Sequence, residues 1–248
     1  MPLSVAIITR NAASQLESCL ASVTFAEEVV VVDSGSTDGT IELATRRGAR
    51  VIAKEWLGFG PQKQFAVESA SNDWVLCLDA DESLSEELRT SIIAELMAPR
   101  GLVYAMPRCN RFLGRWLRHG EGYPDWSVRL FHRKHAQWGN EPVHEKVATA
   151  LPVLRLRGDL LHDSAETLEK YLDKQNRYTS LQAESLRSAG RRANVLQLVL
   201  SPSIRFIKFY LLRLGFLDGV PGLVHIAIGC MNTFNKYAKL KALERASK

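Results

Sequence analysis

Three short apolar runs, each followed at once by polar residues, constrain the fold more than any other feature of this chain. They are Leu3 to Thr9, Glu28 to Val32 and Trp74 to Leu78, and the first two are rich in β-branched residues. Stretches with helical spacing separate them, so the first third of the chain alternates strand and helix. This alternation predicts an α/β domain with a mostly parallel sheet and helices on both faces.

The same periodicities predict the remaining elements. Helices are expected at 12–23, 37–47, 62–69, 85–97 and 163–188, and further strands at 50–53, 102–107, 127–132 and 153–157. Ser14 is a candidate N-terminal cap of the first helix, and Ser83 or Ser85 caps the helix at 85–97. Gly48 suits the position just past the second helix, where a left-handed backbone is common.

Formal charge is distributed unevenly along the 248 residues. Residues 1–185 hold 21 Lys and Arg against 25 Asp and Glu, a net charge of −4, whereas residues 186–248 hold 11 against 2, a net charge of +9. We therefore expect a main domain over 1–185 and a basic amphipathic helical tail over 186–248. A basic tail suggests an anionic partner. The chain has no recognisable nucleic-acid-binding pattern, which favours a membrane surface over nucleic acid.

Two interpretations of the tail stay open. Apolar residues fill one broad face of its first helix, with Arg205, Lys208 and Arg213 opposite them. The tail is either a helical pair docked on the core or a hairpin lying at the surface of an anionic bilayer. Charged residues interrupt its apolar stretches, so no clear transmembrane span is predicted.

Polar and acidic side chains follow the apolar runs, at the end of the strands where ligands bind in such sheets. The chain carries there Thr9 and Asn11, then Asp33 and Gly35, then Asp79 and Asp81. Two carboxylates two residues apart repel each other unless a cation intervenes, and Mg²⁺ is held by one or two carboxylates plus substrate phosphates. The pair Asp79 and Asp81 therefore predicts a metal site. The Gly-rich fingerprints of dinucleotide-binding and P-loop proteins are missing.

These segments together resemble a known family. The strings LSVAIITRN, VVVVDSGSTDGT, GFGPQKQFA and DWVLCLDADE look like the nucleotide-sugar half of glycosyltransferase family 2, which has the GT-A fold. Later strings, YPDWSVRLFHR, PVHEKV and LGFLDGVPGL, resemble a subgroup that includes bacterial lipopolysaccharide core glucosyltransferases. The resemblance implies an inverting transfer from a nucleoside diphosphate sugar that needs Mg²⁺ or Mn²⁺. It assigns residues 1–98 to the nucleotide sugar and 99–185 to the acceptor.

The resemblance also implies roles for the residues that match the family motifs. The nucleotide-sugar contacts would be Thr9, Asn11, Asp33, Gly35, Lys63 and Asp79. Asp81 would be the most direct metal ligand, next to Asp79. The residues around them add His144 as a candidate ligand, with His162 as its rival. The later ED pair and QxxRW motif of many family members are not clearly present, which leaves the catalytic base open.

Inverting transfer needs a side chain that removes the proton of the acceptor hydroxyl. We predict that Glu145 is this base, with Asp125 as the alternative. For the acceptor, we predict contacts with Arg108, Arg129 and Trp126, because aromatic faces stack on sugar rings and Arg binds carboxylates and phosphates. An anionic glycolipid would suit these side chains.

The sequence therefore predicts a glycosyltransferase that acts peripherally on the cytoplasmic face of a bacterial inner membrane, with a UDP-sugar as the expected donor. The first residues lack the pattern of a secretory signal peptide, and the scattered cysteines favour a reducing compartment. Two alternatives remain, a nucleotidyltransferase and a peripheral membrane module without catalytic activity.

Overall fold

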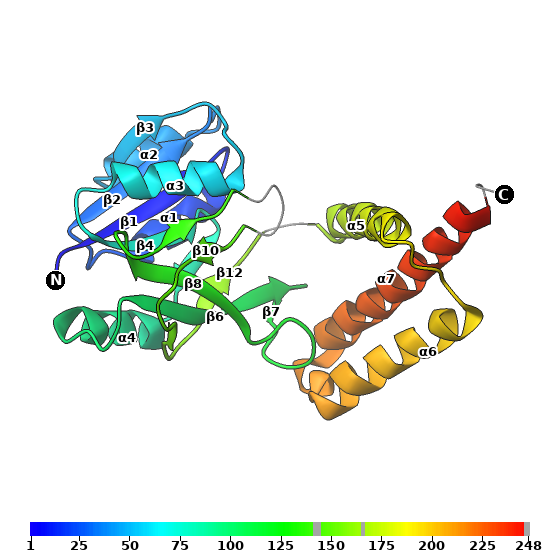
Figure 1. Cartoon of the computed structure of the whole chain (residues 1–248). Coiled ribbons are helices and arrows are strands. Elements are labelled where there is room, and N and C mark those ends of the chain that lie inside the picture. The colour runs from blue at the N-terminus through cyan, green and yellow to red at the C-terminus, as the bar shows by residue number, and fades with distance from the viewer. Residues whose placement is uncertain (141–144, 165–166, 246–248) are drawn as a thin grey trace. The chain divides into compact units, whose positions relative to one another are not determined.

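The computed structural model describes residues 1–140, 145–164 and 167–245, which fall into two compact units (Figure 1). The first unit comprises Met1–Cys109 and Pro124–Ser164, and the second comprises Asn110–Tyr123 and the described residues after Ser164. Helix α5 (Leu168–Ser188) belongs to the second unit. The boundary that we predict between residues 185 and 186 stays a prediction.

A sheet of ten strands has the order β3-β2-β1-β4-β8-β6-β12-β5, with β11 and β7 paired to β6. Its first half is parallel. Strand β1 (Leu3–Thr9) lies between β2 (Glu28–Asp33) and β4 (Trp74–Asp79), and β3 (Arg50–Ala53) pairs with β2. The register pairs Thr9 with Asp33, and the neighbouring Ile8 with Asp79. The polar strand ends that the sequence singles out therefore meet at one edge of the sheet.

The second half of the sheet is largely antiparallel. Strand β8 (Asp125–His132) runs between β4 and β6 (Val103–Phe112), and β5 (Glu82–Leu84) pairs with β12 (Leu160–His162). The sequence pattern misses β5 and β12 because strands of three residues show no periodicity. It also misses three strands of two residues, β7 (Arg115–Trp116), β9 (Gln137–Trp138) and β10 (Val147–Ala148). The expected strand at 153–157 shortens to β11 (Leu154–Arg155).

Helices cover both faces of the sheet, as the sequence predicts. One face carries α1 (Ala13–Ser22), α2 (Thr40–Arg46) and α4 (Glu86–Met97), which contribute buried residues to the larger of the two cores of the sheet. The other face carries α3 (Phe59–Ser69), whose Ala66 and Val67 pack in the second core.

Two of the predicted helix ends are confirmed and one is wrong. The Ser85 hydroxyl accepts a hydrogen bond from the Leu88 amide and caps α4. Gly48 takes a φ of +80° after α2, and the amide of Ala49 reaches back to the carbonyl of Ala44, which closes a Schellman motif. Ser14 does not cap α1, because the cap position is Ala12 and no side-chain bond closes it.

Glu28 ties together several strands at the edge of the sheet opposite to Asp33 and Asp79. Its carboxylate accepts hydrogen bonds from the hydroxyl of Ser4, the amide and hydroxyl of Ser71, and the guanidinium of Arg50. Burial alone would raise the pKa of Glu28, but these donors lower it from its ordinary value of 4.5 to about 2.

We expect Glu28→Gln to lower the free energy of unfolding by roughly 2 kcal/mol at pH 7. The lowered pKa means that the stabilisation is present above pH 4.5 and is lost as the pH falls toward 2. Urea unfolding at pH 7 and at pH 3 measures it, with the exposed Glu42→Gln as the control. A difference between wild type and Glu28→Gln that stays equal at both pH values would contradict this account.

The second unit is built from helices and the segment Asn110–Tyr123, which contains β7 and a loop. Helices α5 and α6 (Val195–Phe206) each pack along α7 (Gly219–Arg245), and α6 continues as a π-helical turn over Ile207–Leu212 (Figure 1). The loop of this unit is fastened to the helices by an ion pair between Glu121 and Arg205 and by a 3.0 Å contact between His119 and Asp218. Arg205 is thus half-buried and paired with Glu121. The prediction from the sequence, which places it on a solvent-facing side of the helix, is wrong for this residue.

One helical stretch, Val195–Leu212, is long and apolar enough to cross a membrane by length and composition alone, with a mean hydropathy of 1.4. None of this stretch is buried within the protein. It contains Arg205 and Lys208, and these charges are the reason that the sequence alone predicts no clear transmembrane span.

Candidate active site

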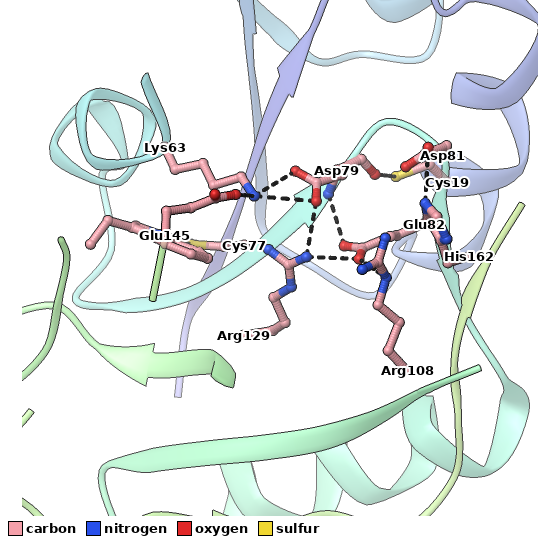
Figure 2. A network of polar contacts seen from close by, with 11 residues as sticks. Cys19, Lys63, Cys77, Asp79, Asp81, Glu82, Arg108, Arg129, Glu145 and His162 are labelled. Atoms are coloured by element: carbon pink, nitrogen blue, oxygen red, sulfur yellow. Dashed lines mark hydrogen bonds and ion pairs between the residues drawn. The ribbon is translucent and has the colours of Figure 1, made fainter. Parts of the chain in front are cut away.

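Asp79, at the end of β4, is held by two cations of the protein itself. The Lys63 ammonium lies 3.0 Å from one carboxylate oxygen of Asp79, and Arg129 donates to the other at 2.9 Å. Figure 2 shows the two cations approaching Asp79 from different sides. Burial alone would raise the pKa of Asp79, but the charges of Arg129 and Lys63 hold it well below its usual range. Lys63 and Arg129 therefore supply positive charge that helps to offset the repulsion between Asp79 and Asp81.

Glu82 holds Asp79 and Arg129 in place through hydrogen bonds, although the sequence did not predict a role for it. It is fully buried and accepts hydrogen bonds from the amide of Asp79 at 3.0 Å and from Arg129 at 2.7 Å. Arg108 pairs with the same carboxylate at 3.1 Å. Arg108 and Arg129, our predicted acceptor contacts, thus lie inside the carboxylate network, where Arg129 is only 5% exposed.

Lys63 links Asp79 to Glu145. Its ammonium lies 2.9 Å from the Glu145 carboxylate and 4.8 Å from the ring centre of Trp138, above the ring. Arg129 lies over the same indole at 5.5 Å, so the ring of Trp138 contacts both of the cations that bind Asp79. Trp138 is a site residue that the sequence did not predict. The one feature that could have pointed to it is its position a few residues before Glu145.

Asp81 turns away from this network and pairs with His162. The distance from the Asp81 carboxylate to Nε2 of His162 is 3.2 Å. The pairing of β12 with β5 brings His162 opposite Glu82, and the amide of Asp163 donates to the carbonyl of Asp81. Our other candidate ligand, His144, lies outside the described residues. Among the residues that the structure does describe, no group of three or more His, Cys, Asp or Glu side chains is arranged to hold a metal ion.

At the predicted nucleotide-binding end of the site, the loop after Asp33 is hydrogen-bonded to Asn11, which follows β1. The buried Asp33 carboxylate accepts hydrogen bonds from the amides of Gly35 and Ser36, both at 2.9 Å, and from the Ser36 hydroxyl. The φ of Gly35 is +88°, a conformation that favours glycine. Asn11 also has a positive φ and bonds this loop through the amide of Thr37.

Thr9 is the predicted nucleotide contact with a vacant hydrogen-bonding group. Its side chain is buried, and its hydroxyl has no hydrogen-bond partner among the described residues. A buried hydroxyl left unpaired costs free energy, so it marks a place where a ligand can supply the partner. Asp33 and Asp79 lie on the strands that flank it.

The structure separates the two candidate bases. Glu145 reaches the carboxylate network through Lys63, whereas Asp125 is exposed at the first residue of β8. Trp126 is 37% exposed, and the guanidinium of Arg155 lies 4.5 Å from its ring centre. Arg155 is a cation beside a predicted acceptor residue that sequence reasoning did not single out.

Comparison with known proteins assigns the family. The profile described as Glycosyl transferase family 2 matches residues 4–155, which include all the carboxylates of the network. The chain belongs to glycosyltransferase family 2. The family assignment and the carboxylates of the site together favour glycosyl transfer over the two alternatives that the sequence leaves open.

Full-length relatives agree with this assignment. An uncharacterised glycosyltransferase of Rickettsia typhi is 32% identical over 99% of this chain and 89% of its own length. The lipopolysaccharide core biosynthesis glycosyltransferase LpsC of Rhizobium meliloti is 31% identical over 97% of this chain and 92% of its own.

A solved structure was also matched. Glucosyl-3-phosphoglycerate synthase of Mycobacterium tuberculosis, in complex with Mn²⁺, UDP and glucosyl-3-phosphoglycerate, matches 44% of each chain with 23% identity and a TM-score of 0.38. A backbone likeness at that level says nothing about the ligands of this family 2 member.

Proposed function

We propose that this glycosyltransferase moves a sugar from a nucleoside diphosphate sugar, a UDP-sugar in our expectation, to a glycolipid of the lipopolysaccharide core type, with inversion at the anomeric carbon. The observation that carries the proposal is the chain of contacts from Glu145 through Lys63 to Asp79, two residues before Asp81. It supports a general base that is connected through Lys63 to the carboxylates at the end of β4, where a divalent cation would hold the diphosphate. The likeness to LpsC supports the class of acceptor.

Glu145 acts as the base in this proposal. Its carboxylate takes the proton of an acceptor hydroxyl as that oxygen attacks the anomeric carbon and the diphosphate leaves from the opposite side. The ion pair with Lys63 holds the carboxylate in one position. A base that is already oriented needs no rearrangement at the moment of attack.

The departing diphosphate needs positive charge near it. The network combines three carboxylates, Asp79, Glu82 and Glu145, with three cations, Lys63, Arg108 and Arg129, and Asp81 lies beside it in contact with His162. Asp81 and His162 are the two side chains that fit a divalent cation, because Mg²⁺ is held by few protein ligands plus phosphate oxygens. When bound there, Mg²⁺ or Mn²⁺ supplies counter-charge to the leaving diphosphate.

The acceptor side of the proposal involves Trp126 and Arg155. An exposed indole offers a flat face to a sugar ring, and a guanidinium offers a fork to a carboxylate or phosphate. This pair supports an anionic carbohydrate acceptor, in place of the network-bound Arg108 and Arg129.

A panel of nucleotide sugars tests the donor half of the proposal. The purified protein is incubated with each sugar in the presence of Mn²⁺, and release of the free nucleoside diphosphate is measured. One nucleotide sugar should be turned over well above the others. Failure of every nucleotide sugar, with and without a glycolipid extract, would reject the proposed function.

The surface of the second unit supports a membrane location for the enzyme, on the cytoplasmic face of the inner membrane. Large apolar side chains there are exposed, and along α6 and its continuation they are Val195, Leu196, Val199, Leu200, Ile204, Ile207, Leu211 and Leu212. Exposed apolar surface of this extent marks an interaction site. The net charge of +9 over residues 186–248 suits an anionic leaflet.

We expect the protein to sediment with anionic liposomes more than with neutral ones, and high salt to release only part of it, because the apolar contribution is not screened. The test reverses the charges of the exposed Arg191 and Lys208. Arg205 is left unchanged, because its replacement would break the ion pair with Glu121. Each basic residue near such a leaflet contributes about 1 kcal/mol, so Arg191→Glu with Lys208→Glu should weaken binding at least tenfold.

The matched control places the same charge change in the first unit, at the exposed Arg46 and Arg157. Turnover of the soluble donor should survive in both double variants. Equal loss of liposome binding in the two would mean that only net charge matters, and the assignment of this surface would be wrong.

A further inference from the structure

Trp56, in the loop between β3 and α3, and Phe59, the first residue of α3, form an exposed aromatic pair. Trp56 is 46% exposed, Leu57 46% and Phe59 54%, although large apolar side chains of the first unit lie mostly in its two cores. The rings of Trp56 and Phe59 meet edge to face, with centroids 4.9 Å apart. Exposed aromatic rings that already support each other are suited to stacking against a flat ligand.

This loop is fixed to the two parts of the site. Gln62, fully buried, accepts from the amide of Leu57 at 3.2 Å and donates to the Ser34 hydroxyl at 3.0 Å. A side chain on Gly60 would lie 2.0 Å from the carbonyl oxygen of Gly139 and 3.6 Å from Cβ of Glu145. The loop is therefore held between the loop that follows Asp33 and the strand region next to the proposed base.

Trp56 comes shortly after a residue whose backbone is bonded to Asp33. The amide of Lys54 donates to the carbonyl of Asp33 at 2.9 Å, which extends the pairing of β3 with β2, and Trp56 follows two residues later. The Asp33 carboxylate and the vacant Thr9 hydroxyl offer only edge contacts to a nucleotide. The flat faces of its base would need a different partner.

We propose that Trp56 stacks on the nucleobase of the donor, with Phe59 supporting the indole from its edge. The inference rests on the proposed use of a nucleoside diphosphate sugar and adds the residue that binds the base. Stacking on an indole accepts any base, because every base has a π-face. Trp56 therefore contributes affinity for the nucleoside, whereas the choice among bases falls to the edge contacts near Asp33.

The test compares a ligand that has a base with one that does not. Titration calorimetry in Mn²⁺ measures the affinity of wild type for UDP, CDP, ADP and GDP, and the tightest of these serves as the nucleotide probe. Inorganic pyrophosphate is the probe without a base. Trp56→Ala should weaken nucleotide binding by about 5- to 150-fold, the range for loss of one base–aromatic stack, and leave pyrophosphate binding unchanged.

Two further variants sharpen the result. Trp56→Phe keeps a flat ring and should stay within about 3-fold of wild type. Leu57→Ala removes an equally exposed apolar side chain from the same loop without removing a ring, and should leave nucleotide affinity unchanged.

Several outcomes would overturn the inference. The first is an unchanged nucleotide affinity in Trp56→Ala. The second is a parallel loss of pyrophosphate binding, which would show that the substitution distorts the whole site. The third is a loss of liposome binding alone, which would assign the aromatic pair to lipid. A wild-type protein that binds none of the nucleotides would reject the proposed function itself. Wild-type binding without any effect of Trp56→Ala would reject only the stacking role.

Discussion

Glu145→Gln should lower kcat by about 10²- to 10⁴-fold while the affinity for the nucleotide donor changes little. The amide keeps the shape of the side chain but cannot accept the proton of the acceptor hydroxyl. Lys63 keeps its second carboxylate partner, Asp79, so the network loses one ion pair and is not dismantled. Single-turnover transfer to a glycolipid acceptor measures the chemical step directly.

The alternative base supplies the control. Asp125 is exposed and, on our account, plays no part in proton transfer, so Asp125→Asn should keep kcat within about 3-fold of wild type. Thermal unfolding of both variants separates a catalytic loss from a loss of structure. If Glu145→Gln transfers sugar normally and Asp125→Asn does not, the base is Asp125.

Asp81→Ala should reduce turnover by about 10³-fold or more, because the leaving diphosphate loses a divalent counter-ion worth several kcal/mol. The fold should hold, since Asp81 is partly exposed and its one described side-chain partner is His162. Turnover as a function of Mn²⁺ concentration is the measurement, and EDTA should stop the wild-type enzyme.

His162→Gln is the graded companion of that experiment. If His162 shares the cation with Asp81, the Mn²⁺ concentration for half-maximal turnover should rise about 10-fold or more, with recovery at saturating metal. The exposed Glu87→Ala removes a nearby carboxylate and should change nothing. Full activity of Asp81→Ala in EDTA would show that no metal acts at this position.

The strands that carry the site could be predicted because a strand is signalled by a short run of apolar residues next to one another in the sequence. Leu3–Thr9 forms β1 with the expected bounds, and the register of β1 with β2 and β4 gathers Thr9, Asp33 and Asp79. Nothing in the sequence pairs Lys63 with Asp79 and Glu145, since the last contact spans 82 residues. The partner of each charge depends on tertiary packing, so Lys63 reads as a surface or nucleotide-binding lysine until the fold is known.

The arginines illustrate the same limit. Arg108 and Arg205 both lie in segments that look solvated or ligand-facing by composition. Each instead pairs with a glutamate, Glu82 for the first and Glu121 for the second. Side-chain type predicts that an arginine seeks a carboxylate, but whether that carboxylate belongs to the protein or to a ligand is decided by strand and helix packing.

The most direct test of the central claim is transfer of labelled sugar from the preferred nucleotide sugar to a lipopolysaccharide-core glycolipid. We predict labelled glycolipid with the wild-type enzyme and Mn²⁺, of opposite anomeric configuration to the donor, and none with Glu145→Gln or Asp81→Ala. A labelled product that retains the donor configuration, or that forms equally well with both variants, would contradict the account.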